Sequence, residues 1–224
     1  MLERSEKYDR SFVRKCMGGP NALYLTEELT DSMHLAADMT VLDLGCGRAL
    51  SSVFLAKEYG VLVYAVDLFQ HASETYNMLR DIGMSDRVFP IQADAAALPA
   101  QPGTFDALTC VNSWHNFGME KGFFRKKIRP LLRDGAEAGF VLLGKAEGYV
   151  KEKEDENPAF WSGRAWRNFF EEEGLIVETC EELLSTKAAW MEWMNINTPD
   201  MTKEELEASR INPELALIKI VGRV

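Results

Sequence analysis

The stretch TVLDLGCGRALSSVFLAKEYG, residues 40–60, decides the fold of this 224-residue chain. It begins with a short apolar run that predicts a buried strand, turns at Gly45 and Gly47, and continues with apolar residues at helical spacing. Glycines between a strand and a helix let ligand atoms approach the backbone, and the helix N-terminus offers free N–H groups. The stretch therefore predicts a ligand-binding loop.

The same alternation of apolar runs and helical segments continues along the chain. Further strands are predicted at residues 61–67, 87–94, 105–113, 138–144, 175–183 and 215–224, and further helices at residues 71–83, 122–132 and 162–174. Strands separated by helices of this length favour a parallel sheet that is covered by helices on both faces. The sequence therefore indicates an α/β fold, in which ligands gather at the carboxyl ends of the strands.

Two segments lie outside this alternation. Residues 1–39 read as an amphipathic helical segment broken at residues 18–22, with Asn21 as the predicted N-cap of its second helix. Residues 184–212 form an insert of helical character that carries Trp190 and is too long for a hairpin turn. We expect the insert on the sheet edge, where a role as substrate lid is one interpretation. One domain, 1–224, is the simplest organisation.

Bulk composition limits the kinds of partner. The net charge of −10 argues against broad binding to nucleic acid or to anionic membranes, which both need an excess of Lys and Arg. The one basic run, residues 125–133, reads as a solvated helix face. The four scattered cysteines favour neither a disulfide framework nor a zinc site, so no metal is expected. With a charged N-terminus and no apolar run of membrane-spanning length, we expect a cytoplasmic protein.

Aspartates follow the predicted strands and suggest what the loop binds. Asp67 stands about 20 residues beyond the loop, where a carboxylate can accept hydrogen bonds from both ribose hydroxyls. Leu68 could pack on a purine face, and Asp94 after the next strand could accept from the exocyclic amine of adenine. Asp43 precedes the loop itself. For each aspartate alone, orienting the loop or capping a helix is the alternative, but together they favour an adenosine ligand.

Four motifs, in this order and spacing, resemble the class I S-adenosylmethionine-dependent methyltransferases, especially the small-molecule branch that includes the ubiquinone-biosynthesis and sarcosine-forming types. They are VLDLGCG at 41–47, VYAVDL at 63–68, RVFPIQADAAALP at 87–99 and FDALTCVNSWHNFG at 105–118. The resemblance is strong over residues 41–144 and weaker up to residue 224. It implies a Rossmann-like three-layer sandwich with a seven-stranded, mostly parallel sheet whose last strand is antiparallel.

The resemblance also implies S-adenosylmethionine as cofactor and S-adenosylhomocysteine as product. Residues of the glycine loop would approach the amino-acid part of the cofactor, and Asp43 would meet the amino group of that part through the loop. Asp94, after the third strand, and Ala95, which follows it, would meet the adenine. Asn112, at the end of the fourth strand, would lie beside the methionine portion. The implied cofactor residues are Asp43, Gly45, Cys46, Gly47, Asp67, Leu68, Asp94, Ala95 and Asn112.

Two positions in the loop depart from related patterns. Many family members have glycine where this chain has Ala49, and because alanine is small we expect little loss. Leu50 stands where a dinucleotide-binding loop needs a third small residue to pack a pyrophosphate against the helix. S-adenosylmethionine has no phosphate, so Leu50 is compatible with this cofactor and counts against NAD.

Methyl transfer from a sulfonium mainly requires that the nucleophile be held in line with the methyl carbon, in a dry site. An oxygen or nitrogen nucleophile also needs a general base, and His115, in the loop after the fourth strand, is the candidate. The alternative is a hydrogen-bonded loop histidine without catalytic work. Trp114 either lines the substrate pocket or packs beneath the loop.

The predicted function is methyl transfer to a small-molecule acceptor. One alternative is a non-catalytic S-adenosylmethionine-binding protein, because fold does not fix activity. An NAD(P)-dependent oxidoreductase is disfavoured by Leu50 and by the lack of a Tyr-x-x-x-Lys pair near the fourth strand. Methylation of nucleic acid is disfavoured by the acidic charge and by NSWHN where an Asn/Asp-Pro-Pro-aromatic sequence would stand. The acceptor atom and the oligomeric state stay open.

Overall fold

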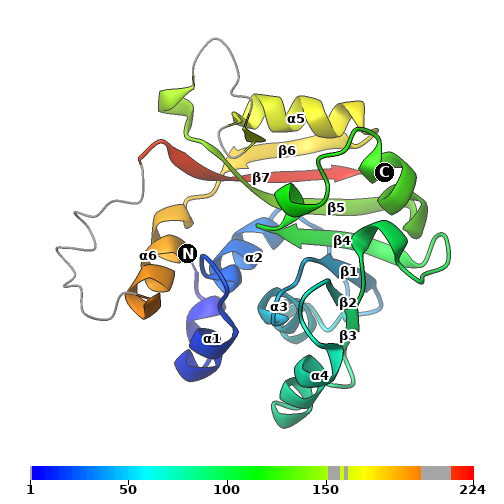
Figure 1. Cartoon of the computed structure of the whole chain (residues 1–224), viewed down its shortest axis with the longest axis vertical. Coiled ribbons are helices and arrows are strands. Elements are labelled where there is room, and N and C mark those ends of the chain that lie inside the picture. The colour runs from blue at the N-terminus through cyan, green and yellow to red at the C-terminus, as the bar shows by residue number, and fades with distance from the viewer. Residues whose placement is uncertain (1, 151–156, 159–160, 198–212) are drawn as a thin grey trace.

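Seven strands form one sheet in the order β3-β2-β1-β4-β5-β7-β6 (Figure 1). The computed structural model describes residues 2–150, 157–158, 161–197 and 213–224. The strands are β1 Thr40–Leu44, β2 Leu62–Asp67, β3 Val88–Gln92, β4 Phe105–Val111, β5 Leu132–Lys145, β6 Ile176–Glu182 and β7 Leu215–Arg223. All pairs are parallel except those of β7, which runs antiparallel to β5 and β6. The predicted mostly parallel sheet with an antiparallel last strand is confirmed.

Helices and short helical turns connect the strands. The α-helices are α1 Arg10–Cys16, α2 Ala22–Thr30, α3 Leu50–Tyr59, α4 Ala72–Asp81, α5 Gly163–Glu172 and α6 Thr186–Asn197. The 3-10 turns are η1 Ser5–Lys7, η2 Ala95–Ala97, η3 Trp114–Asn116, η5 Arg129–Leu131 and η6 Glu147–Tyr149, and η4, Phe124–Ile128, is a π-helical turn. In the described part of the chain, no helix has the length and apolar character needed to cross a membrane.

Each face of the sheet carries its own hydrophobic core, because successive strand residues point to opposite faces. Val41 of β1 packs into a core that α1, α2 and α3 contribute to, whereas its neighbour Leu42 packs into a second core. The second core contains aromatic side chains of η3, η4 and α5, with the rings of Phe140 and Phe170 only 4.2 Å apart. The result is the predicted three-layer arrangement.

The helix predicted at residues 122–132 forms as two short irregular helical turns rather than as one α-helix. The chain forms the π-helical turn η4 and then the 3-10 turn η5. Pro130 has no N–H to donate, so the hydrogen-bond ladder of an α-helix is interrupted here, although Arg129 before it keeps helical dihedral angles of φ −50° and ψ −41°. The basic residues Arg125, Lys126 and Lys127 are exposed, as expected for a solvated face.

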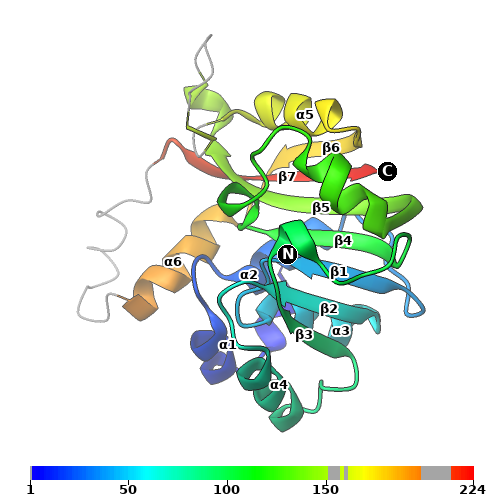
Figure 2. The same ribbon diagram turned by 45° about the vertical axis from the view of Figure 1, so that its right-hand side comes forward.

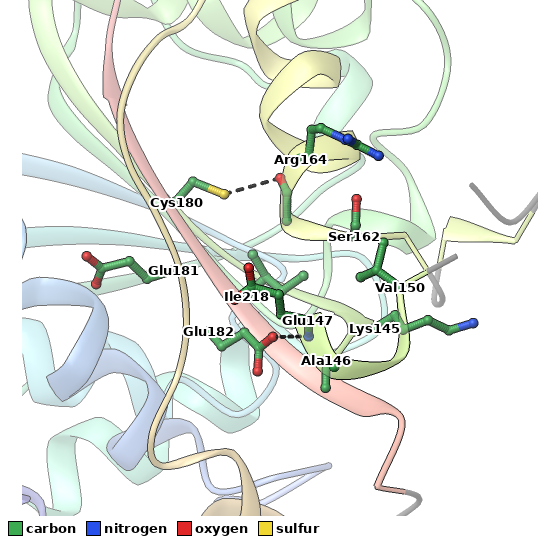
Figure 3. A pocket seen from close by; sticks show the side chains of 12 residues that line it. Lys145, Ala146, Glu147, Val150, Ser162, Arg164, Cys180, Glu181, Glu182 and Ile218 are labelled. Carbon is green, nitrogen blue, oxygen red and sulfur yellow. Dashed lines mark hydrogen bonds between the residues drawn. The ribbon is translucent and has the colours of Figure 1, made fainter. Parts of the chain in front are cut away.

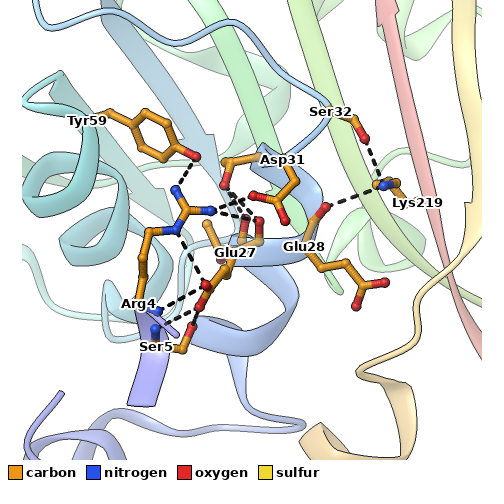
Figure 4. Close-up of polar contacts among 10 residues, drawn as sticks. Arg4, Ser5, Glu27, Glu28, Asp31, Ser32, Tyr59 and Lys219 are labelled. Atoms are coloured by element: carbon orange, nitrogen blue, oxygen red, sulfur yellow. Dashed lines mark hydrogen bonds and ion pairs between the residues drawn. The ribbon is translucent and has the colours of Figure 1, made fainter. Parts of the chain in front are cut away.

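The N-terminal segment is tied to α2 and α3 by a polar network around Glu27 (Figure 4). The Glu27 carboxylate is 3 % exposed and accepts hydrogen bonds from the backbone N–H groups of Arg4 and Ser5, at 3.1 and 2.7 Å, and from the Ser5 hydroxyl. Arg4 also donates to the Tyr59 hydroxyl and to Asp31, both at 2.6 Å. This network fixes where the chain enters α1.

The insert between β6 and β7 begins with α6. This helix packs beside α1 and α2 rather than on an edge strand. Figures 1 and 2 both show α1 and α6 side by side. The Glu192 carboxylate of α6 accepts from Arg10 of α1 and from the side chain of Asn21. Asn21 also caps α2 as predicted, because its side chain accepts from the N–H of Leu23. Residues 198–212 of the insert lie outside the described residues.

Candidate cofactor-binding site

The glycine loop lies between β1 and α3, at the carboxyl edge of the sheet. The N–H groups of Gly45 and Cys46 donate to the Val66 carbonyl of β2 at 2.8 and 3.1 Å. Gly45 and Gly47 have φ values of 66° and 55°, in the left-handed region that glycine adopts without steric cost. A Cβ atom on Gly45 would lie 2.5 Å from the Cβ of Ser113, whereas one on Gly47 would meet no atom within 4 Å. Only Gly45 is therefore enclosed by its neighbours.

Ala49 follows the loop with φ 60° and ψ 28°, and it is buried. The sequence suggested little loss because alanine is small, yet size is not what matters at this position. The left-handed conformation brings the alanine Cβ close to the following carbonyl oxygen, which costs about 1–2 kcal/mol for an L-residue. The loop therefore carries a backbone strain that a glycine would not have.

Replacing Ala49 with glycine is expected to raise the free energy of unfolding by up to about 1 kcal/mol, because the relieved strain exceeds the roughly 0.5–1 kcal/mol entropic cost of glycine. Chemical denaturation measures the change. Ala56→Gly in α3 is the matched control, and it should lower stability by about 1 kcal/mol because that residue is helical. A loss of stability in Ala49→Gly would contradict the assigned strain.

Asp43 is fully buried, and its hydrogen bonds stabilise the segment around the glycine loop. Its carboxylate accepts hydrogen bonds from the hydroxyls of Ser51 and Ser52, both at 2.6 Å, and of Thr109 at 3.0 Å. Burial raises the pKa of Asp43, and the three hydroxyl hydrogen bonds oppose this effect. Since the side chain has no exposed surface, Asp43 joins β1 to the first turn of α3 and to β4 rather than facing the cavity.

Asp67 ends β2 and closes the other side of the loop. One carboxylate oxygen accepts from the Gly47 N–H at 3.0 Å, and the second accepts from the N–H groups of Phe69 and Gln70 at 2.8 and 3.1 Å. Asp94, after β3, is exposed and accepts from the Ala96 N–H at 2.8 Å. Both aspartates thus hold backbone turns at the carboxyl ends of their strands, as the alternative interpretation proposed.

Two cavities meet at these strand ends. The first, which we name the loop cavity, measures about 400 Å³ and is enclosed by the glycine loop, residues 16–20 and the end of β4. The second, the strand-end cavity, measures about 350 Å³ and lies over the ends of β2 and β3. Four residues line both cavities: Gly45, Asp67, Ser113 and Asn116. The two cavities are therefore neighbours and together form one elongated site, with Gly45 of the glycine loop lining both parts.

Most of the residues expected to bind the cofactor come together here. Eight of the nine line at least one cavity: Gly45, Cys46, Gly47, Asp67, Leu68, Asp94, Ala95 and Asn112. Asp43 lies behind the loop instead. Burial raises the pKa of the Cys46 thiol well above its usual range and that of Cys16, which also lines the loop cavity, to about 11. Both thiols are neutral at pH 7.

The two residues expected to act on the substrate lie outside both cavities. Trp114 is fully buried and packs edge-to-face on Phe140, with ring centroids 5.1 Å apart. Its position fits the alternative of packing beneath the loop. His115 is largely exposed on η3, and desolvation by neighbouring atoms lowers its pKa, so that the neutral imidazole predominates near pH 7.

Sequence reasoning missed several lining residues. Asn116, one position beyond His115, lines both cavities, as does Ser113. Because η3 is a short 3-10 turn, no periodic pattern indicates which of its side chains faces the site. Residues 18–22 read as a helix break, and their two glycines give no direct signal that residues 16–20 form the roof of the loop cavity.

A third cavity of about 710 Å³ lies at the ends of β5 and β6 beside the start of α5 (Figure 3). It shares no lining residue with the other two cavities, and Arg164 lines it with Lys145 and Glu182 among others. The glycine loop and the strand-end aspartates all lie outside it. Arg164 and this cavity are therefore separate from the elongated site.

Comparison with known proteins agrees with this geometry. Residues 41–135 match the family described as methyltransferase domain. Methyltransferase GfsG of Streptomyces halstedii is 31% identical over 123 residues, which cover 54% of this chain and 44% of that protein. The 27-O-demethylrifamycin SV methyltransferase of Amycolatopsis mediterranei is 26% identical over 176 residues, covering 74% of this chain and 65% of that protein. The chain thus spans less than two thirds of the length of either relative.

Solved structures share the fold. Geranyl diphosphate C-methyltransferase of Streptomyces coelicolor aligns with TM-score 0.67 and 17% identity, covering 89% of this chain and 79% of that chain. The [4+2]-cyclase SpnF aligns with TM-score 0.69 and 18% identity over the same shares. The sheet order and the loop thus define a class I methyltransferase fold. Within this fold, residues 41–135 are the part of the chain that is similar to the methyltransferase domain family.

Proposed function

We propose that this protein is an S-adenosylmethionine-dependent methyltransferase that acts on a small-molecule acceptor. The observation that carries the proposal is the elongated site around the glycine loop, which eight of the nine expected cofactor residues line. The strand-end cavity would take the adenosine, with Asp67 near the ribose and Asp94 near the adenine. The loop cavity would take the amino-acid part beside Asn112.

When bound, S-adenosylmethionine would supply a methyl group on a positively charged sulfur, which would be ready for transfer to a nucleophilic atom of the acceptor. The chain would contribute orientation and exclusion of water rather than a covalent intermediate. An acceptor that carries a proton must lose it, and a neutral His115 has the protonation state to receive it. Because His115 lines neither cavity, we propose this role only for an acceptor that extends from the elongated site to η3.

A small-molecule acceptor is supported by the relatives, which include a methyltransferase described by its substrate 27-O-demethylrifamycin SV and one that acts on geranyl diphosphate. A second candidate function has one observation in its favour. The cyclase SpnF has the same fold without being described as a methyltransferase, so a cofactor-binding protein without methyl transfer is the alternative.

Thermal unfolding with S-adenosylmethionine, S-adenosylhomocysteine or NAD, each at the same concentration, tests the cofactor. A ligand at 100 times its Kd adds about 2.7 kcal/mol to stability, which for a chain of this size raises Tm by roughly 5–10 °C. We expect this shift with the two sulfur compounds and none with NAD. A shift with NAD alone would overturn the proposal.

Transfer of a labelled methyl group then separates the enzyme from the binding protein. We expect label from S-adenosylmethionine to reach at least one member of a panel of hydroxyl, amine and carbon nucleophiles, with S-adenosylhomocysteine formed in equal amount. Binding of both sulfur compounds without transfer to any acceptor in the panel would favour the non-catalytic alternative.

A further inference from the structure

Arg48 has a distinct place in the elongated site. It follows Gly47 in the glycine loop and lines the loop cavity. Three lining residues of the two cavities carry a charge at neutral pH, namely Arg48, Asp67 and Asp94, so Arg48 is the one cation among the lining residues that the structure describes. The carboxylates of both aspartates already accept from backbone N–H groups.

The guanidinium of Arg48 has more N–H donors than its hydrogen bond within the described residues uses. One nitrogen donates to the carbonyl of Lys15 at 2.7 Å, in the last turn of α1, where helical carbonyls lack partners within the helix. Within the residues that the structure describes, Arg48 forms no ion pair, and a guanidinium carries five N–H donors. Since the Cys16 and Cys46 thiols are neutral, they supply no competing anion.

The amino-acid part of S-adenosylmethionine carries a carboxylate, which needs a cation or several donors once water is removed. A guanidinium matches a carboxylate with two parallel hydrogen bonds, and these charge-assisted bonds are stronger than neutral ones. We propose, building on the proposed function, that Arg48 binds the carboxylate of the cofactor's amino-acid part. The same side chain holds the end of α1, so it joins that carboxylate to the segment 16–20 above the loop cavity.

Calorimetric titration with two ligands tests this assignment. S-adenosylhomocysteine carries the carboxylate, and its decarboxylated analogue lacks only that group. We expect Arg48→Gln to weaken binding of S-adenosylhomocysteine by roughly 10- to 100-fold, as for a lost charged hydrogen bond. Binding of the decarboxylated analogue should change less than about threefold, and Arg48→Lys, which keeps the charge but loses the fork, should fall between.

Arg14→Gln is the matched control, because Arg14 is an exposed cation on α1 and its loss lowers the net charge equally. We expect it to leave both affinities unchanged. Equal weakening of the two ligands by Arg48→Gln would show that Arg48 acts only through α1 and would overturn the assignment, as would no change in either. If the unmodified protein binds neither ligand, the proposed function itself fails and the assignment fails with it.

Discussion

Gly45→Ala is expected to lower the free energy of unfolding by about 2–5 kcal/mol, a large share of the total for a domain of this kind. Two costs add at this position. The φ of 66° costs an L-residue about 1–2 kcal/mol. The new Cβ would lie 2.5 Å from the Cβ of Ser113, and relieving such a contact in a packed site typically costs about 1–3 kcal/mol. Urea denaturation measures the loss.

Gly47→Ala separates these two costs. Gly47 has a similar φ of 55°, but its added Cβ would meet no atom within 4 Å. We therefore expect it to lose only the backbone part, about 1–2 kcal/mol. Gly47 also lines the loop cavity, so the added Cβ should weaken the binding of S-adenosylhomocysteine in addition to lowering stability.

A double-mutant cycle assigns the rest of the Gly45 cost to Ser113. The Ser113 hydroxyl donates to the Leu44 carbonyl at 2.9 Å, which ties the loop after β4 to the end of β1. In a Ser113→Gly background, Gly45→Ala should cost only the backbone part, giving a coupling of more than about 1 kcal/mol. Equal costs of Gly45→Ala in both backgrounds would contradict the steric assignment.

The central part of the site is predictable because its residues follow one another along the chain. An apolar strand, two glycines and a helix occupy 21 residues, and the aspartates end successive strands. Parallel strands bring such residues to one edge of the sheet whatever the loops do. This is why Gly45, Asp67 and Asp94 meet around one site, although each also holds a backbone turn.

The unpredicted features depend on backbone geometry or on long-range pairing. The strain at Ala49 comes from its φ, which side-chain size does not reveal. In the turn η3, the side chain that faces the cavities belongs to Asn116 and not to His115, and a turn of three residues has no period to read. The hydrogen bond from Arg48 to Lys15 joins residues 33 positions apart, and nothing local indicates it.

The polar network at Glu27 is a further long-range feature, and its removal is the second large effect we expect. Glu27→Gln should lower the free energy of unfolding at pH 7 by about 2–4 kcal/mol, because removing one partner of a buried charged network leaves the others uncompensated. The amide would present an NH₂ group to N–H and hydroxyl donors of Arg4 and Ser5, which need an acceptor. Denaturation at pH 7 measures the difference.

The effect should depend on pH in a defined direction. Burial alone would raise the pKa of Glu27, but hydrogen bonds from Ser5 and from the backbone of Arg4 outweigh it, and the pKa lies below its usual value. A carboxyl with a lowered pKa contributes stability that is complete above its unfolded pKa, about 4.3, and is lost as pH falls through the folded pKa. The gap between the parent chain and Glu27→Gln should therefore narrow below about pH 4.

Glu6→Gln is the matched control, because Glu6 lies in η1 beside Ser5, a partner of Glu27, but is itself exposed. Surface substitutions of this kind usually change stability by less than about 0.5 kcal/mol. Glu27→Gln should also weaken cofactor binding, since the segment it anchors continues through α1 to residues 16–20, the roof of the loop cavity. Equal stability of the two variants, or a gap that widens toward acid pH, would contradict the role assigned to the Glu27 carboxylate.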